Sequence, residues 1–221
     1  MKLNINSVLL YLLGFLLVLC FVLILMDEKE KKKQFDGADD GGSGTAVLLQ
    51  IAKLLGEKSC NVGVDILLED VEDYGAPYFE PAKGNDDKWY CLGTQDWIKK
   101  AKAENYHAYY GILLDMVGSR GAKFYMDPSA PDVSKKIFDA AQQLGFGNYF
   151  QMQLAPGGIV DDNSFVNAQM QIPSADIIAL DLTNKTTFAK HWHTQQDNMN
   201  IIDKQTLKAV GQTLLQVIYN E

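Results

Sequence analysis

Residues Tyr109–Gly118 have the sequence YYGILLDMVG, and this short apolar run ending at Asp115 decides the fold class. A run of this length, bounded by polar residues and glycine, is typical of a strand that is buried on both faces of a parallel sheet. Strand-like and helix-like segments alternate on either side of it, which predicts an α/β fold with a mostly parallel or mixed sheet and helices on both faces. The predicted strands are Val62–Leu68, Tyr109–Leu114 and Ala175–Leu182, and the predicted helices are Thr45–Leu55, Thr94–Glu104, Val133–Leu144 and Leu207–Ile218.

Residues at the ends of the predicted helices support these bounds. Gly56 and Gly145 each follow a helix, at the position where a glycine commonly ends one. Asp132 and Asp203 precede helices, where a short polar side chain is expected to accept a hydrogen bond from the first free N–H groups.

The length and composition allow one domain and one active site. The chain has 221 residues, 47% of them hydrophobic, which suffices for one compact α/β domain. A net charge of −8 argues against a phosphate-binding surface, so we expect no nucleic-acid partner. The three cysteines, Cys20, Cys60 and Cys91, have no regular spacing and indicate neither a disulfide framework nor a thiolate metal site. We expect buried free thiols, with a Cys60–Cys91 bridge as the alternative.

The N-terminal segment predicts a membrane anchor over residues 1–26. Val8–Met26 is uncharged and long enough to cross a bilayer, which needs about 20 apolar residues. A cleaved signal peptide is the alternative, although its apolar core is usually shorter and ends in small residues. Residues 27–36 form a charged juncture, and residues 37–221 form the domain. Lysines at 29 and 31–33 would keep the domain in the cytoplasm by the positive-inside rule, whereas the resemblance described below implies an extracytoplasmic domain.

Acidic residues follow the predicted strands. Glu72 and Asp73 come after the first strand, and Asp115 comes at the end of the second. Open α/β sheets bind ligands beyond the carboxyl ends of their strands, so these carboxylates are expected to converge on one crevice. An acidic glycine-rich loop, Gly37–Gly44 (GADDGGSG), precedes them, and His191–Asn198 (HWHTQQDN) follows late in the chain. In this order the stretches supply the oxygen and imidazole ligands that zinc accepts.

From about Asp27 to the C-terminus, the chain resembles the zinc aminopeptidase superfamily. Within that superfamily it is most similar to the glutaminyl-peptide cyclotransferases of Bacteroides-like bacteria. The resemblance covers about nine tenths of the chain, and the stretches that carry it are VDILLEDVEDYG, WYCLGTQDW, YYGILLDMVG and the C-terminal run that begins WHTQQDN. It implies an enzyme that cyclises the N-terminal glutamine of peptides and proteins to pyroglutamate and releases ammonia.

The resemblance also assigns the ligands of one zinc ion. Asp40 in GADD, Asp73 in the acidic pair and His193 in WHT would hold the metal. Three protein ligands with an open fourth position are typical of a catalytic rather than a structural zinc site. His191 is the alternative imidazole, but alternate residues of an extended segment face opposite ways, which favours His193.

Further roles follow from the same resemblance. Glu72 would be the general acid and base, Asp115 and Asp162 would be hydrogen-bonding acids, and Trp192 would form a wall of the substrate pocket. A carboxylate crowded by other acids has a raised pKa, which suits a proton carrier near neutral pH.

Three departures from the family qualify this interpretation. The family has a strand ending in His-x-Asp before the first acidic loop, but here no histidine precedes His107, which disfavours a two-metal site. Asn163 stands where a histidine is expected beside Asp162. The first helix and strands of the family are also missing, which leaves a sheet edge uncovered. The alternatives are therefore a zinc aminopeptidase and a catalytically silent, membrane-anchored interaction module.

Overall fold

The computed structural model describes residues 35–73, 75, 87–157 and 159–221. Contacts divide the chain into a unit Met1–Phe35 and a unit Asp36–Glu221, and the second unit contains the elements described below. The predicted membrane span, and all but the last two residues of the charged juncture, lie outside the described residues. Within the described part of the chain, no helix is both long and apolar enough to cross a bilayer.

Two parallel strand pairs form the centre of the second unit. Strand β1 (Gly111–Asp115) pairs with β4 (Ser174–Ile178) from Gly111↔Ser174 to Asp115↔Ile178, and β2 (Phe124–Met126) pairs with β3 (Phe150–Leu154). An antiparallel bridge between Phe124 and Ala179 joins the two pairs. The spatial order is therefore β1, β4, β2, β3, and the predicted parallel-to-mixed sheet is confirmed.

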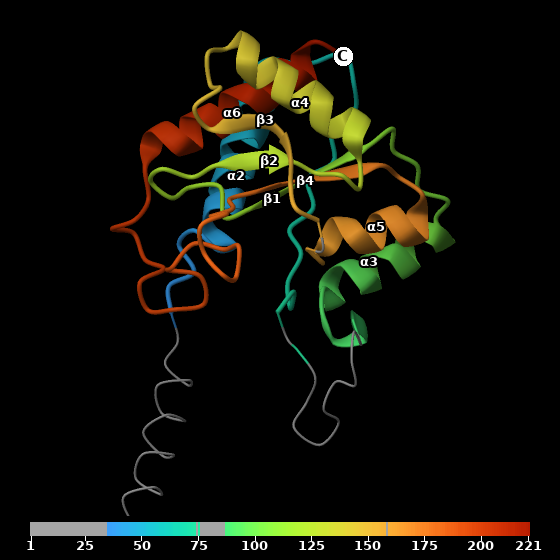
Figure 1. Cartoon of the computed structure of the whole chain (residues 1–221). Coiled ribbons are helices and arrows are strands. Elements are labelled where there is room, and N and C mark those ends of the chain that lie inside the picture. The colour runs from blue at the N-terminus through green and yellow to red at the C-terminus, as the bar shows by residue number, and fades with distance from the viewer. Residues whose placement is uncertain (1–34, 74, 76–86, 158) are drawn as a thin grey trace, which may run out of the picture. The chain divides into compact units, whose positions relative to one another are not determined.

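Helices lie on both faces of these strands, as predicted (Figure 1). Helices α2, α4 and α6 pack together on one side, and α3 and α5 pack together on the other. Their bounds are α2 Gly42–Glu57, α3 Leu92–Ala103, α4 Pro131–Gln143, α5 Asp162–Met170 and α6 Lys204–Tyr219, and a short 3-10 helix spans Asp87–Trp89.

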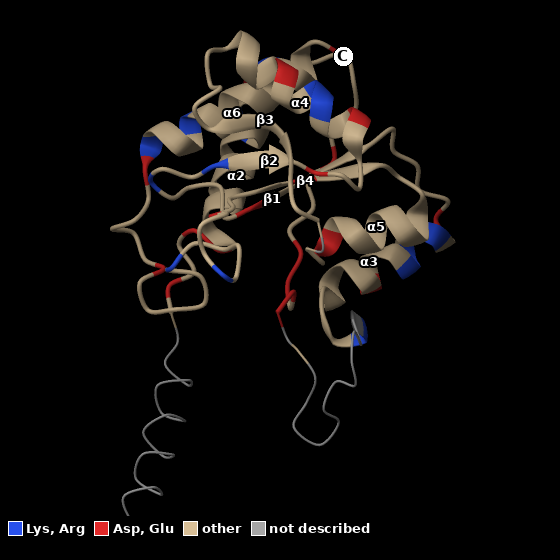
Figure 2. Ribbon diagram, in the orientation of Figure 1, with Lys and Arg blue, Asp and Glu red and all other residues tan. Residues whose placement is uncertain are grey.

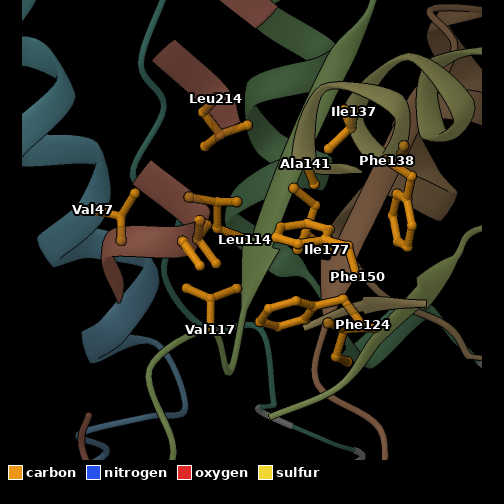
Figure 3. Close-up of a cluster of buried hydrophobic side chains, with 14 of the residues drawn as sticks. Val47, Leu114, Val117, Phe124, Ile137, Phe138, Ala141, Phe150, Ile177 and Leu214 are labelled. Carbon is orange, nitrogen blue, oxygen red and sulfur yellow. The ribbon is translucent and has the colours of Figure 1, made fainter. Parts of the chain in front are cut away.

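Aromatic side chains fill the core between the strands and α4. Phe124, Phe138 and Phe150 are fully buried, and Figure 3 shows them beside Ile177. The Phe150 ring centre lies 4.9 Å from that of Phe124 and 5.2 Å from that of Phe138. Offset and edge-on ring pairs at such distances stabilise a core beyond the area that they bury. This packing fixes the ends of the strands that precede the site.

The helix ends agree with the sequence in one case and differ in two. The Asp203 side chain caps α6 by accepting the N–H of Gln205 at 3.0 Å, as predicted. Helix α4 begins at Pro131 with Ala130 as its N-cap, so the predicted N-cap at Asp132 is wrong. Proline is favoured at the first helical position because its φ is already helical, and Asp132 lies in the first turn. Helix α2 runs one residue past Gly56.

The predicted strand at Val62–Leu68 is not a strand. Its residues adopt no regular secondary structure, and they pair with no strand in the described part of the chain. A cavity of about 300 Å³ is lined by Asp65–Glu69 and by Tyr110–Leu114. Leu67 and Leu68 are exposed. An apolar run becomes a strand only where a neighbouring backbone supplies its hydrogen bonds, and here none does.

Candidate metal centre

Asp40, Asp73 and His193 meet at one point, although they come from three distant parts of the chain. One ligand atom from each lies within 4.8 Å of the other two. The Nε2 atom of His193 is 2.7 Å from Oδ2 of Asp73 and 3.4 Å from Oδ2 of Asp40. Two carboxylates and one imidazole are a donor set that zinc accepts. The side chains therefore suit a zinc ion with a free coordination position.

The start of α3 holds the segment that carries Glu72 and Asp73. The backbone N–H of Cys91 donates to the carbonyl oxygen of Glu72 at 2.8 Å, and that of Gly93 donates to Asp70 at 3.1 Å. Glycine is required at 93, because a Cβ there would lie 2.6 Å from the carbonyl oxygen of Asp70. The WYCLGTQDW stretch thus fixes where the acidic pair points.

Asp40 occupies the turn before α2, and this helix begins against the end of β1. A Cβ at Gly44 would lie 2.4 Å from the carbonyl oxygen of Leu114, so only glycine allows this contact. The glycine-rich loop and the carboxyl end of β1 are therefore in direct contact. Burial, followed by the charges of Asp161 and Asp40, raises the pKa of Asp115, the last residue of β1.

The two late histidines have different surroundings. His193 has a left-handed backbone (φ 53°) and directs its ring to the two carboxylates. The Trp192 ring stacks on it, with ring centres 4.1 Å apart, and packs on Phe188 from the other side. His191 instead pairs with Asp39, its Nε2 lying 2.9 Å from Oδ2. The structure thus places His193, and not His191, with the other two predicted ligands.

A second cluster of possible metal ligands lies next to the cluster of Asp40, Asp73 and His193. Ligand atoms of Glu72, Cys91 and Asp161 lie within 4.8 Å of one another. Burial, and then the charge of Asp161, raises the pKa of Glu72 to about 9. Burial also raises the pKa of Asp161 to about 7 and raises that of Asp115, whose next largest cause is Asp161. Figure 2 shows the acidic residues at the start of α5 and along the segment that leads to residue 73.

Asp161 is a functional candidate that the sequence did not indicate. It caps α5, accepting the N–H of Asp162 at 2.6 Å and forming a capping box with Ser164. The predicted Asp162 lies beside Thr94 and Cys91, which donate hydrogen bonds to it. An acid followed three residues later by Ser is a helix-start signal that could have marked Asp161 as the inward-facing member of the pair.

Asn163, which stands where the family led us to expect histidine, has a structural position. Its Nδ2 donates to Oδ2 of Asp127 at 2.8 Å and to the carbonyl oxygen of Ser174 at 3.2 Å. The side chain is buried and joins the start of α5 to β4. The substitution therefore leaves the site acids in place.

The raised pKa values predict how pH affects the metal-free protein. Burial raises the pKa of Asp40 to about 6, that of Asp161 to about 7 and that of Glu72 to about 9. Stability from such groups is complete below their unfolded pKa of about 4 and is lost as pH rises through the folded values. We expect the midpoint of thermal unfolding to fall between about pH 5 and about pH 8, measured by calorimetry in EDTA. A midpoint that stays constant or rises would contradict this arrangement of acids.

Known proteins resemble this chain in sequence and in fold. Residues 26–218 match the model of peptidase family M28. The chain belongs to peptidase family M28. Among curated M28-like relatives, aminopeptidase YwaD of Bacillus subtilis is 26% identical over 191 residues, which cover 83% of this chain and 37% of the relative.

Solved structures similar to this M28 chain include a cyclase and an exopeptidase. Glutaminyl cyclase of Tannerella forsythia is 47% identical with a TM-score of 0.79, and the match covers 86% of this chain and 66% of that one. A Zn-dependent exopeptidase of Parabacteroides distasonis is 48% identical with a TM-score of 0.78, covering 85% and 64%. The chain thus spans just under two thirds of these structures and little more than a third of the curated relative. The family and the α/β fold predicted from the sequence are confirmed.

Proposed function

We propose that the chain is a zinc-dependent glutaminyl-peptide cyclotransferase. The observation that carries this proposal is the position of Glu72, a carboxyl with a raised pKa beside the ligand group Asp40, Asp73 and His193. The cavity that contains Glu72 is also lined by Asp40, Asp115 and Asp161. A proton carrier next to a site for a Lewis acid is what cyclisation of glutamine requires. The 47% identity to a glutaminyl cyclase is consistent with this reaction, and the 48% identity to a Zn-dependent exopeptidase is consistent with the second candidate below.

Each residue has a defined task in the proposed reaction. Glu72 takes a proton from the α-amine of the substrate, whose nitrogen forms a bond to Cδ, the carbonyl carbon of the glutamine side-chain carboxamide. Glu72 then gives the proton to the departing carboxamide nitrogen, so the C–N bond breaks and ammonia leaves. Zinc, when bound, polarises the γ-carbonyl group, and its charge opposes the rise in the pKa of Glu72.

Neighbouring side chains assist Glu72 in this scheme. Burial raises the pKa values of Asp161 and Asp115, as it raises that of Glu72. Trp192 stacks on the metal ligand His193, and on this position beside the metal centre we assign it to the wall of the substrate site. We assign Asp161, and not Asp162, as the acid that works with Glu72 because Asp161 belongs to the same close group.

A zinc aminopeptidase is the second candidate, because the curated relative that matches is an aminopeptidase. That reaction uses an activated water molecule and usually a second metal ion. Within the described residues, the other group able to hold a metal contains Glu72 itself with Cys91 and Asp161. Burial raises the pKa of the Cys91 thiol, so it is a poor ligand while it stays protonated.

Metal analysis and product analysis on the full-length chain test the proposal. Incubation with a peptide that begins with glutamine should release ammonia and give a pyroglutamyl peptide, with about one zinc ion per chain by mass spectrometry. Release of free N-terminal amino acids, with about two metal ions per chain, would support the aminopeptidase. Bound zinc without turnover on either kind of peptide would support a silent interaction module.

A further inference from the structure

Asp197 binds the backbone of the loop that carries Asp40. Its side chain is completely buried, and both carboxylate oxygens are occupied by backbone groups of this loop. Oδ1 accepts the N–H of Asp39 at 2.7 Å, and Oδ2 accepts the N–H of Asp40 at 3.1 Å. One carboxylate thus binds two consecutive peptide groups, the second of which carries a predicted zinc ligand.

Further buried hydrogen bonds extend this arrangement to β1 and to the late loop. Oδ1 of Asp39 accepts the N–H of Gly118 at 2.7 Å, and Oδ2 of Asp39 meets His191. The Ser43 hydroxyl donates to the carbonyl oxygen of Asp39 at 2.6 Å and accepts the N–H of Val117 at 2.9 Å. The turn that carries Asp40 is therefore held from three directions, and Asp197 is the group that binds Asp40 itself.

We propose that Asp197 is the positioning residue of the metal centre, fixing the backbone of Asp40 so that its carboxylate faces His193 and Asp73. Asp197 and His193 belong to the same short loop, and the N–H of Asp197 donates to Thr194 at 3.0 Å. One loop thus supplies a ligand directly and orients a second ligand through its backbone. Side chains that orient ligands contribute to metal affinity without contacting the metal. This inference rests on the metal centre of the proposed function.

A carboxylate is needed at this position because it offers two acceptors. Asparagine has one acceptor oxygen, and its NH₂ group would face the N–H of Asp39 or Asp40. One of these N–H groups would lose its partner, and one of them belongs to a fully buried residue. An unpaired buried donor is unfavourable, so the loop relaxes and Asp40 moves away from the other ligands.

The test compares Asp197→Asn with Asp203→Asn in the full-length chain. Asp203 receives the same chemical change, but asparagine caps a helix as well as aspartate does, and Asp203 lies outside the metal ligand group. We expect Asp197→Asn to weaken zinc binding about 10- to 100-fold in a chelator competition assay. The visible spectrum of the cobalt-loaded protein should change as well, since it reports ligand geometry. Asp203→Asn should match the parent in both measurements.

The outcomes separate this inference from the function on which it rests. Unchanged zinc affinity and cobalt spectrum in Asp197→Asn would overturn the positioning role, even if the variant unfolds at a lower temperature. If the parent binds no zinc, both the metal centre and the positioning role fail. If Asp197→Asn does not fold, amide hydrogen exchange measured in the parent tests the positioning role instead. Slow exchange at Asp39 and Asp40 that speeds up when His193→Ala removes the metal supports the coupling, and exchange unaffected by the metal overturns it.

Discussion

Replacing Glu72 with glutamine should slow ammonia release from a glutaminyl peptide by about 10²- to 10⁴-fold, because this is the usual contribution of general acid and base catalysis. The corresponding increase in the barrier is about 3 to 5 kcal/mol. Glutamine keeps the size of the side chain and its hydrogen-bonding capacity, but it cannot carry a proton between the attacking amine and the departing nitrogen. Zinc content should remain at about one ion per chain, since Glu72 is outside the ligand group Asp40, Asp73 and His193.

A paired measurement makes this result specific. Glu57→Gln, at the exposed end of α2, is the matched control and should turn over like the parent. The rate of the parent should rise with pH as Glu72 ionises, and this limb of the profile should disappear in Glu72→Gln. A Glu72→Gln protein that keeps both its zinc and the parent rate would rule out Glu72 as the proton carrier.

Loss of one ligand should remove the zinc together with the activity. Asp73→Asn replaces a charged ligand with a neutral amide, and His193→Ala removes the imidazole, so neither variant should hold stoichiometric zinc after dialysis. Turnover should fall to the background of the assay in both. Mass spectrometry of the metal and ammonia release on the same preparations provide the measurement.

His107→Ala is the control for this second experiment. His107 is exposed and lies outside the ligand group, so its removal should leave zinc content and rate unchanged. If His193→Ala kept its zinc while His191→Ala lost it, the assignment of the imidazole ligand would be reversed. Zinc retained by Asp73→Asn would show that the acidic pair contributes its ligand from Glu72.

Local signals in the sequence predicted the larger elements well. Strands β1 and β4 lie in short, mostly apolar runs, β4 is buried along its whole length, and α6 begins at an aspartate that caps it. Strand β2 has three residues, and α5 has one fully buried residue, Asn163, so neither carries an apolar pattern that sequence periodicity could detect. Val62–Leu68 is the opposite case. It has the apolar pattern of a strand, but the local sequence does not show whether another strand supplies its hydrogen bonds.

The residues of the candidate site could likewise be predicted from the sequence only in part. The resemblance to the zinc aminopeptidase superfamily assigned Asp40, Asp73 and His193 as ligands, and the structure brings these three together. The choice between Asp161 and Asp162 depended on which of two adjacent acids faces inward. That direction follows from the extended backbone of the residue before α5, which residue types alone do not determine.

The capping box at the start of α5 makes one side chain serve both the helix and the acid cluster. An Asp161→Ala protein would lose the helix cap, worth about 1 kcal/mol, together with the ionisable group, so a drop in its rate would have two inseparable causes. Asparagine caps as well as aspartate does but carries no titratable proton. The choice of replacement at this one position therefore decides whether an experiment measures chemistry or folding.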